Sequence, residues 1–449
     1  MRRVQKVLVY LSVLFGIIGP AFMAFPVGPI HIFPYRVIVP FIWLFFIAEV
    51  ILRHGKIVIS RIKSIKIYLQ FFMIWLIYAL LSIVWTLDKI AAVKEIISLF
   101  MGVSIVFFMV YFLSDKKGVW NLYKLWIFLL TMVLPIALWE IFTGNHLHIS
   151  GLYTYQPTKA TNEYVKFMPS VIFHNPNDFA TFLALSVPFV LVWIRYAKKV
   201  VIRVIALAEL LLAFYVLLMT YSRANYIAVM IEFAFLFFVI LKLNGKIRFV
   251  VSLMFLGLFV GVIQPGLIVK IAGLFMGQVT SLLDPDAFYS GSVFVRINLI
   301  KNSFVFLWKT FGFGVGAGNA EYWMENFAVY NTLGILNVHN WWVEILVNFG
   351  IFIFAGYILF YVGLIKNIYK IYNQNPRLPS TSIKSYSRIN KSHDKMIGES
   401  LLLSLIGFFM ASISSSSIMT LRPQWFLLGF ALAFLNYKRN QWKNKICTS

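Results

Sequence analysis

The chain has 449 residues, of which 61% are hydrophobic, 18% aromatic and only 12% charged. Ordinary soluble domains are nearer half apolar and a quarter charged, so this composition excludes that class. The net charge of +24 would suggest a nucleic-acid partner unless topology explains the basic residues.

Apolar runs long enough to cross a hydrocarbon core of about 30 Å recur along almost the whole chain. They predict an all-α polytopic membrane protein with about 12 transmembrane helices and no soluble domain. The first run follows Arg2, Arg3 and Lys6 but lacks a small-residue cleavage site, so we expect an uncleaved helix. The predicted spans are 7–24, 36–53, 68–86, 96–113, 123–142, 177–196, 200–221, 223–243, 247–268, 340–365, 399–418 and 424–437.

The basic residues concentrate in every second connection between these spans. With the N-terminus in the cytoplasm, 29 of the 40 Lys and Arg residues fall in cytoplasmic segments. This distribution follows the positive-inside rule, so the basic balance indicates topology and we expect no nucleic-acid partner. The sequence therefore predicts a multi-pass protein of the cytoplasmic membrane, surrounded by membrane lipid, with both termini cytoplasmic.

Two outer connections are long, at residues 143–176 and 269–339. The second is rich in aromatic residues, so we expect it to fold against the membrane surface. The predicted organisation is therefore helices one to nine in 1–268, a large extracytoplasmic loop between helices nine and ten in 269–339, and helices ten to twelve in 340–449, with a basic cytoplasmic loop at 366–398 and a tail.

Cysteine and histidine usage indicates neither a disulfide nor a zinc site. Cys447 is the single cysteine, and no Cys/His pair has metal-ligand spacing. We predict no metal and no cofactor, although magnesium held by carboxylates leaves no comparable signature.

The segment 291–312, "GSVFVRINLIKNSFVFLWKTFG", has the length and composition of a helix. Arg296 lies on its apolar side, where a guanidinium needs an anion. The alternatives are that it reaches water or lipid phosphate, or that it pairs with Glu321 or Glu325. The opposite side, which we expect to face water, carries Asn298, Lys301, Asn302 and Lys309.

A glycine-rich stretch, "GFGVGAGNAEYW", follows this helix. Gly314, Gly316 and Gly318 allow a tight turn, and we expect their N–H groups to be available to an anion. The stretch follows no strand and lacks the Gly-Lys-Ser/Thr of a P-loop, so a nucleotide-binding fold is rejected.

"MTYSRANYIAV", residues 219–229, places Arg223 at the outer junction of the seventh and eighth spans, against the charge rule. One interpretation is a side chain that anchors at the membrane interface. The other is a fixed cation aimed at a phosphate, for which guanidinium offers a rigid fork of donors.

"NVHNWWVEILVNFG", residues 337–350, begins the tenth span with several polar groups. Asn340, Glu344 and Asn348 are spaced i, i+4 and i+8, and such a stripe inside lipid must face protein or a water-filled cavity. A lone interfacial histidine is more often structural than catalytic. Beside a buried carboxylate and two misplaced arginines, His339 is nevertheless a candidate base, because imidazole accepts a proton near neutral pH.

These residues carry a resemblance to a known family. His339 and Asn340, followed by Gly350, resemble the His-Asn/Ser-x9-Gly signature of the O-antigen ligase and O-antigen polymerase superfamily. "TYSRANY" and "VRINLIKNSF...FGFGVGAGN" resemble its two arginine motifs, and residues 84–95 and 173–189 are similar to other family segments. One departure is Ile353, where the ligase pattern has Gly, Thr or Tyr.

The resemblance implies an inverting, metal-independent membrane glycosyltransferase. Its substrates would be a polyprenyl-diphosphate-linked oligosaccharide donor and a glycan acceptor, and other polysaccharide-assembly proteins are candidate partners. The implied catalytic residues are His339, Arg223 and Arg296, supported by Asn340, Glu344, Gly316 and Gly350.

Within the family, a polymerase extends lipid-linked glycan, whereas a ligase hands the glycan to another acceptor. Ile353 departs from the ligase pattern, and the Lys, Ile and Asn-rich usage suggests a low-GC Gram-positive source, which has no lipopolysaccharide for a ligase to modify. Both observations favour a polymerase that makes a capsular, exopolysaccharide or teichuronic-type polymer. A flippase or transporter is the alternative from another class, and its polar residues should lie near mid-membrane. Here the polar residues cluster at the outer surface, and only Glu49, Glu209 and Glu232 lie plainly in mid-span, either as pathway residues or as carboxylates satisfied between helices. The roles of these three glutamates, the sugar identity and linkage, chain-length control and oligomeric state stay open.

Overall fold

A computed structural model describes residues 2–22, 25–27, 30–52, 61–154, 163–251, 292–373, 384–415 and 419–446, with positions 254, 266 and 273. A small antiparallel hairpin, β1 with β2, joins α1 to α2. The elements are α1 (Arg2–Phe22), β1 (Phe25–Val27), β2 (Ile30–Ile32), α2 (Pro34–Leu52), η2 (Lys63–Ile65), α3 (Lys66–Ser82), α4 (Lys89–Leu113), α5 (Lys116–Thr143), η3 (Glu163–Phe167), α6 (Pro176–Tyr196), α7 (Val200–Met219), α8 (Arg223–Phe235), η4 (Leu236–Ile240), α12 (Ser292–Lys309), α13 (Ala320–Phe327), α14 (Trp341–Asn373), α15 (Lys384–Ala411) and α16 (Arg422–Ile446).

The helices confirm a multi-pass membrane protein. Among the described residues, 8 helices are long and apolar enough to cross a membrane, namely α2 to α7, α8 together with η4, and α14. Helices also occupy three further expected spans, as α1, α15 and α16, but these are not among the 8. The ninth expected span, 247–268, lies mostly outside the described residues, so the total of about 12 stays a prediction.

Side-chain caps fix where several of the helices begin. Asp88 caps α4 by accepting hydrogen bonds from two backbone N–H groups, and Asp115 and Asn175 cap α5 and α6 by accepting one each. Such caps satisfy N–H groups that have no partner inside the helix.

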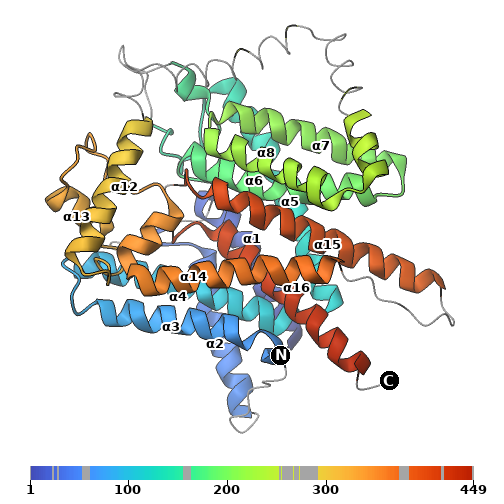
Figure 1. The fold of residues 1–449 in the computed structure, drawn as a ribbon, viewed down its shortest axis with the longest axis horizontal. Coiled ribbons are helices and arrows are strands. Elements are labelled where there is room, and N and C mark those ends of the chain that lie inside the picture. Colours follow the sequence, from blue (N-terminus) through green and yellow to red (C-terminus); the bar gives the residue numbers. More distant parts are fainter. Residues whose placement is uncertain are drawn as a thin grey trace.

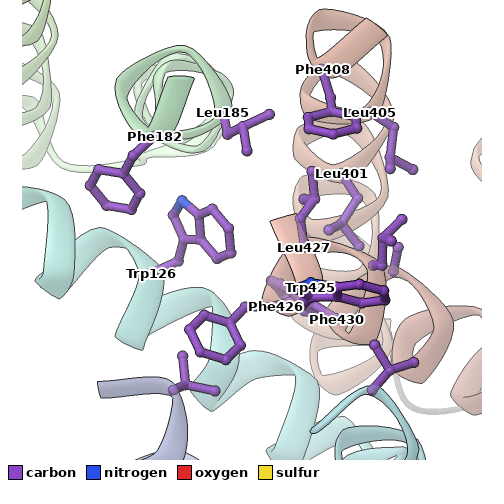
Figure 2. Packing of buried hydrophobic residues seen from close by; sticks show 14 of the residues in the cluster. Trp126, Phe182, Leu185, Leu401, Leu405, Phe408, Trp425, Phe426, Leu427 and Phe430 are labelled. Atoms are coloured by element: carbon purple, nitrogen blue, oxygen red, sulfur yellow. The ribbon is translucent and has the colours of Figure 1, made fainter. Parts of the chain in front are cut away.

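The core lies where α5, α6, α15 and α16 pack together (Figure 2). Trp126 of α5 packs between Phe182 and Phe189 of α6, and its indole nitrogen donates to the Ser186 hydroxyl at 3.0 Å. Ser404 of α15 donates to a carbonyl of α6 at 2.6 Å. Hydrogen bonds of this kind hold helices together where lipid removes the hydrophobic driving force.

One end of the bundle gathers the starts of α2, α4, α6, α8, α14 and α16, because consecutive helices alternate in direction. Asn225 of α8 donates to Ser414 at 3.0 Å, and Ser415 donates to Asp178 of α6 at 2.8 Å. Helices α12 and α13 lie against α14 at this same end (Figure 1). We call it the α12 end.

Two of the three mid-span glutamates have polar partners on neighbouring helices. Glu49 of α2 lies 3.7 Å from Arg2 of α1, and Glu209 of α7 accepts a hydrogen bond from Thr131 of α5 at 2.7 Å. Glu232 of α8 is buried, and neither carboxyl oxygen has a hydrogen-bond partner among the described residues. The first two therefore fit carboxylates satisfied between helices, whereas the role of Glu232 stays open.

Candidate functional site

A break in α14 positions the glycine-rich turn. Gly350 has φ 77° and ψ 179°, so the helix is interrupted there. The freed backbone groups pair with the turn: Ile351 N donates to Gly312 O at 2.9 Å, and Gly316 N donates to Asn348 O at 3.0 Å. A Cβ at position 350 would lie 2.4 Å from Gly312 O, so only glycine fits both this conformation and this contact.

The same turn also rests on the connection between α3 and α4. A Cβ at Gly316 would lie 2.2 Å from the Thr86 side chain. The Asn319 amide oxygen accepts from the Leu87 and Asp88 N–H groups at 3.1 and 2.8 Å. The expectation that the N–H of Gly316 is available to an anion is therefore wrong, because that group is used in docking the turn onto α14.

His339 lies just before α14 in a strained backbone conformation. Its φ is 52°, and its N–H donates to the Asn337 side chain at 2.9 Å. The imidazole Nδ1 is buried and has no hydrogen-bond partner among the described residues. Strain of this kind, held by surrounding structure, is common at functional sites.

Asn340 is the N-cap of α14 and does not orient the imidazole. Its side-chain oxygen accepts from the Trp342 and Val343 N–H groups at 3.0 and 3.2 Å. Its relation to His339 is therefore structural, because it fixes where the helix begins directly after the histidine.

Arg223 is the first residue of α8, directly after a tight turn from α7. The turn is tied down by Asn225, whose amide donates to Ser222 at 2.9 Å and to Ser414 at 3.0 Å. Tyr221 enters the turn with φ 53°, and its ring lies 4.8 Å from that of Tyr164. The motif "TYSRANY" thus builds a rigid support for the guanidinium.

Arg296 lies on α12, and more of this helix is buried than the sequence predicted. Asn298 is 5% exposed and Asn302 is fully buried, so the expectation that these two residues face water is wrong, whereas Lys301 and Lys309 of the same predicted side are exposed. Their amides donate to the carbonyls of Asn331 and Tyr330 at 2.8 Å each, and Asn302 also accepts from two N–H groups of that loop. The loop covers this side because the asparagines satisfy its backbone. No ion pair joins Arg296 to Glu321 or Glu325 in the described part of the chain.

Arg296 lies close enough to Arg223 and to His339 for their charges to interact. Burial lowers the pKa of His339, the Arg296 guanidinium lowers it further, and Asp178 acts in the opposite direction. Burial also lowers the pKa of Arg296, and Arg223 adds to that effect. We call Arg223, Arg296 and His339 the cationic cluster. At neutral pH its histidine is favoured as the uncharged imidazole, the form that can accept a proton.

Asp178 is a site residue that the sequence interpretation missed. It lies in the first turn of α6, is 1% exposed, and receives hydrogen bonds from Asn175 at 3.0 Å and Ser415 at 2.8 Å. The signal was present, because Asn175 and Asp178 are spaced as a reciprocal helix cap. The contact of Asp178 with Ser415 depends on tertiary packing and could not be predicted from the cap alone.

Glu344 lies on a different side of α14 from the cationic cluster. It lines a cavity of about 770 Å³ together with Glu95 of α4 and Glu321 of α13. We call this cavity the acidic pocket. Asn348 lines the same cavity, so two members of the predicted stripe face a cavity as expected, whereas Asn340 caps the helix. Among the described residues, no hydrogen bond joins Glu344 to the buried His339 Nδ1.

The residues brought together here fall within a recognisable family region. Residues 208–358, which include the whole cationic cluster, match the family described as O-antigen ligase. The chain is also 30% identical over 438 residues to "Teichuronic acid biosynthesis protein TuaE" of Bacillus subtilis (strain 168), an alignment that covers 97% of this chain and 85% of that protein. The chain therefore belongs to the O-antigen ligase and O-antigen polymerase superfamily, whose membrane proteins act in polysaccharide biosynthesis with a glycosyltransferase-type activity.

Proposed function

We propose that the protein is an inverting membrane glycosyltransferase that polymerises polyprenyl-diphosphate-linked glycan repeat units for a cell-surface polymer of the teichuronic type. The proposal is supported by the proximity of three residues at one end of the bundle. They are Arg223 of α8, Arg296 of α12 and His339, which directly precedes α14. The distribution of basic residues supports an α12 end on the outer face of the cytoplasmic membrane and both termini in the cytoplasm.

In the proposed reaction the acceptor hydroxyl oxygen attacks C1 of the donor sugar from the side opposite the diphosphate. The new C1–O bond forms as the bond to the diphosphate breaks, and the diphosphate leaves with the electron pair. Arg223 and Arg296 stabilise its growing negative charge, because fixed guanidinium groups in a poorly solvated site act strongly on such charge. His339 takes the hydroxyl proton.

The electrostatics support this division of roles. An imidazole can act as a base only when it is uncharged, and burial and Arg296 lower the pKa of His339 in that direction. An arginine stays protonated even when burial lowers its pKa, so Arg296 keeps the charge that the leaving group requires.

A ligase is the second candidate, favoured by the description of the family that matches residues 208–358. Deletion of the gene followed by sizing of the lipid-linked glycan separates the candidates. Single repeat units left on the lipid indicate a polymerase, and full polymer left on the lipid indicates a ligase. Repeat units trapped inside the cell would indicate a flippase and overturn both.

Point variants expressed in the deletion strain test the site itself. His339→Ala and Arg296→Ala should abolish chain extension while leaving membrane insertion intact. His393→Ala, which removes a ring stacked on Trp120 of α5, and Lys301→Ala, on the exposed side of α12, are the matched controls. Polymer of wild-type length in both site variants would exclude the proposed mechanism.

A further inference from the structure

The acidic pocket lies between α2, α4, α13 and α14 at the α12 end. Its volume of about 770 Å³ lies within the range of small-molecule sites, about 300 to 1,000 Å³. Carboxylates line one part of it, and apolar side chains of α2 and α4, including Val37, Pro40 and Phe100, line another. The cavity therefore suits a ligand with both hydrogen-bonding groups and apolar faces.

Two of the pocket carboxyl groups have unused hydrogen-bonding capacity. Glu95 Oε1 and Glu344 Oε2 are buried, and neither has a hydrogen-bond partner among the described residues. Asp88 and Glu321 also line the pocket, but Asp88 caps α4 and Glu321 accepts from Asn337 at 3.1 Å. Since unpaired buried polar atoms are costly, Glu95 and Glu344 are the groups that a ligand would satisfy.

The chemistry of the lining selects among ligand classes. Four carboxyl groups line the pocket together with Arg36 and Lys94, so the wall offers both hydrogen-bond acceptors and donors, and it lacks the pair of arginines available in the cationic cluster for a diphosphate. No His, Cys, Asp or Glu side chains within the described ranges form a group of three suited to a metal ion. Sugar hydroxyls fit such a lining, because each one can both donate to a carboxylate and accept from a cation.

The pocket is also joined to the cationic cluster through one side chain. Asn337 donates to Glu321 on the pocket wall at 3.1 Å and accepts from the His339 N–H at 2.9 Å. A ligand in the pocket therefore lies beside the loop that holds the imidazole. The diphosphate of the donor belongs with the two arginines, and this leaves the pocket for the other substrate.

We propose that the acidic pocket binds the terminal sugar of the acceptor glycan, with Glu95 and Glu344 accepting hydrogen bonds from its hydroxyl groups. This assignment rests on the proposed glycosyl transfer. It makes the two sides of α14 complementary, one for the donor diphosphate and one for the acceptor saccharide, with His339 between them.

The test measures binding separately from catalysis. Oligosaccharide fragments released from the host's own cell-surface polysaccharide are titrated against the full-length protein in detergent and followed by saturation-transfer NMR. The Glu95→Ala, Glu344→Ala double variant removes both acceptors and should bind the fragments at least tenfold more weakly than the wild type. Glu325→Ala, which removes an exposed carboxylate on α13, is the matched control and should bind normally.

A second variant tests the pocket independently, in case the double variant does not fold. Val37 is 41% exposed at the rim of the pocket, so Val37→Trp narrows the cavity without entering the core. It should weaken fragment binding and raise the acceptor KM with little change in kcat. Wild-type binding in either correctly folded pocket variant would overturn the assignment.

His339→Ala separates this inference from the proposed function. It should bind the fragments as the wild type does while transferring no glycan. Fragment binding that depends on Glu95 and Glu344, together with normal chain extension by His339→Ala, would reject the proposed mechanism but retain the saccharide site.

Discussion

The two sides of the α14 N-terminus are lined by different ionisable groups although both are built from helix starts at one end of the bundle. One side holds the cationic cluster of Arg223, Arg296 and His339. Burial and the charge of Arg296 lower the pKa of His339. The other holds a cavity lined by Glu95 and Glu344. In the proposed mechanism, the start of α14 therefore lies between a diphosphate site and a saccharide site, because the side chains of one helix point in different directions.

The largest expected effect is on the cationic side. His339→Gln keeps a polar side chain but removes the base, and it should reduce the transfer rate by about 10² to 10⁴ in a reconstituted assay with lipid-linked repeat units. Glu344→Ala, one turn into α14, removes the proposed acceptor group and should change mainly the acceptor KM. Equal loss of kcat in the two variants would remove the functional distinction between the two sides.

Arg296→Lys should have the next largest effect. The charge remains, but the rigid pair of donors that suits a diphosphate is lost, so we expect a rate loss of about 10- to 100-fold, less than the loss for complete removal of one stabilising donor. The same assay with Lys301→Arg, on the exposed side of α12, should show a normal rate. A lysine variant with full activity would show that Arg296 contributes charge alone.

Gly350→Ala should destabilise the break in α14 that positions both the cationic cluster and the acidic pocket. Its Cβ would lie 2.4 Å from Gly312 O, and its φ of 77° is unfavourable for alanine, so we expect a loss of stability of about 1 to 3 kcal/mol. Gly334→Ala is a matched control, because Gly334 also has φ 77° but has no atom within 4 Å of an added Cβ. Thermal unfolding in detergent should therefore show a larger decrease in Tm at position 350.

The smallest expected effect is a shift in pH dependence. The His339 base is active only when deprotonated, so the rate should fall as the pH decreases through its pKa. Asp178 raises that pKa, and Asp178→Asn should therefore move the acidic limb of the pH–rate profile to lower pH. A limb that stays in place would mean that the charge of Asp178 does not reach the imidazole. The amide oxygen of the substituted side chain can still accept from Ser415, so folding should be preserved.

Much of the fold was predictable because a membrane helix can be recognised from the hydropathy of its own segment. Long apolar runs located α2 to α8 and α14, although α4 and α5 each begin seven residues before the predicted span and α14 continues eight residues beyond it. The two arginines and the histidine stood out as polar groups where lipid disfavours them. The interpretation of Asn298 and Asn302 as water-facing was wrong, because a helical wheel shows which residues share a side but not which loop covers it.

The sequence by itself determined that this chain spans a membrane, and its motifs indicated the family before any tertiary contact was known. Only the tertiary structure decided that Gly316 docks its backbone on α14, that Ser415 donates to Asp178 of α6, and that Glu344 lines a pocket with Glu95. The physical reason is that hydropathy and helical periodicity are properties of one segment. Contacts between residues far apart in the chain depend on how the helices pack, and no single segment encodes that packing.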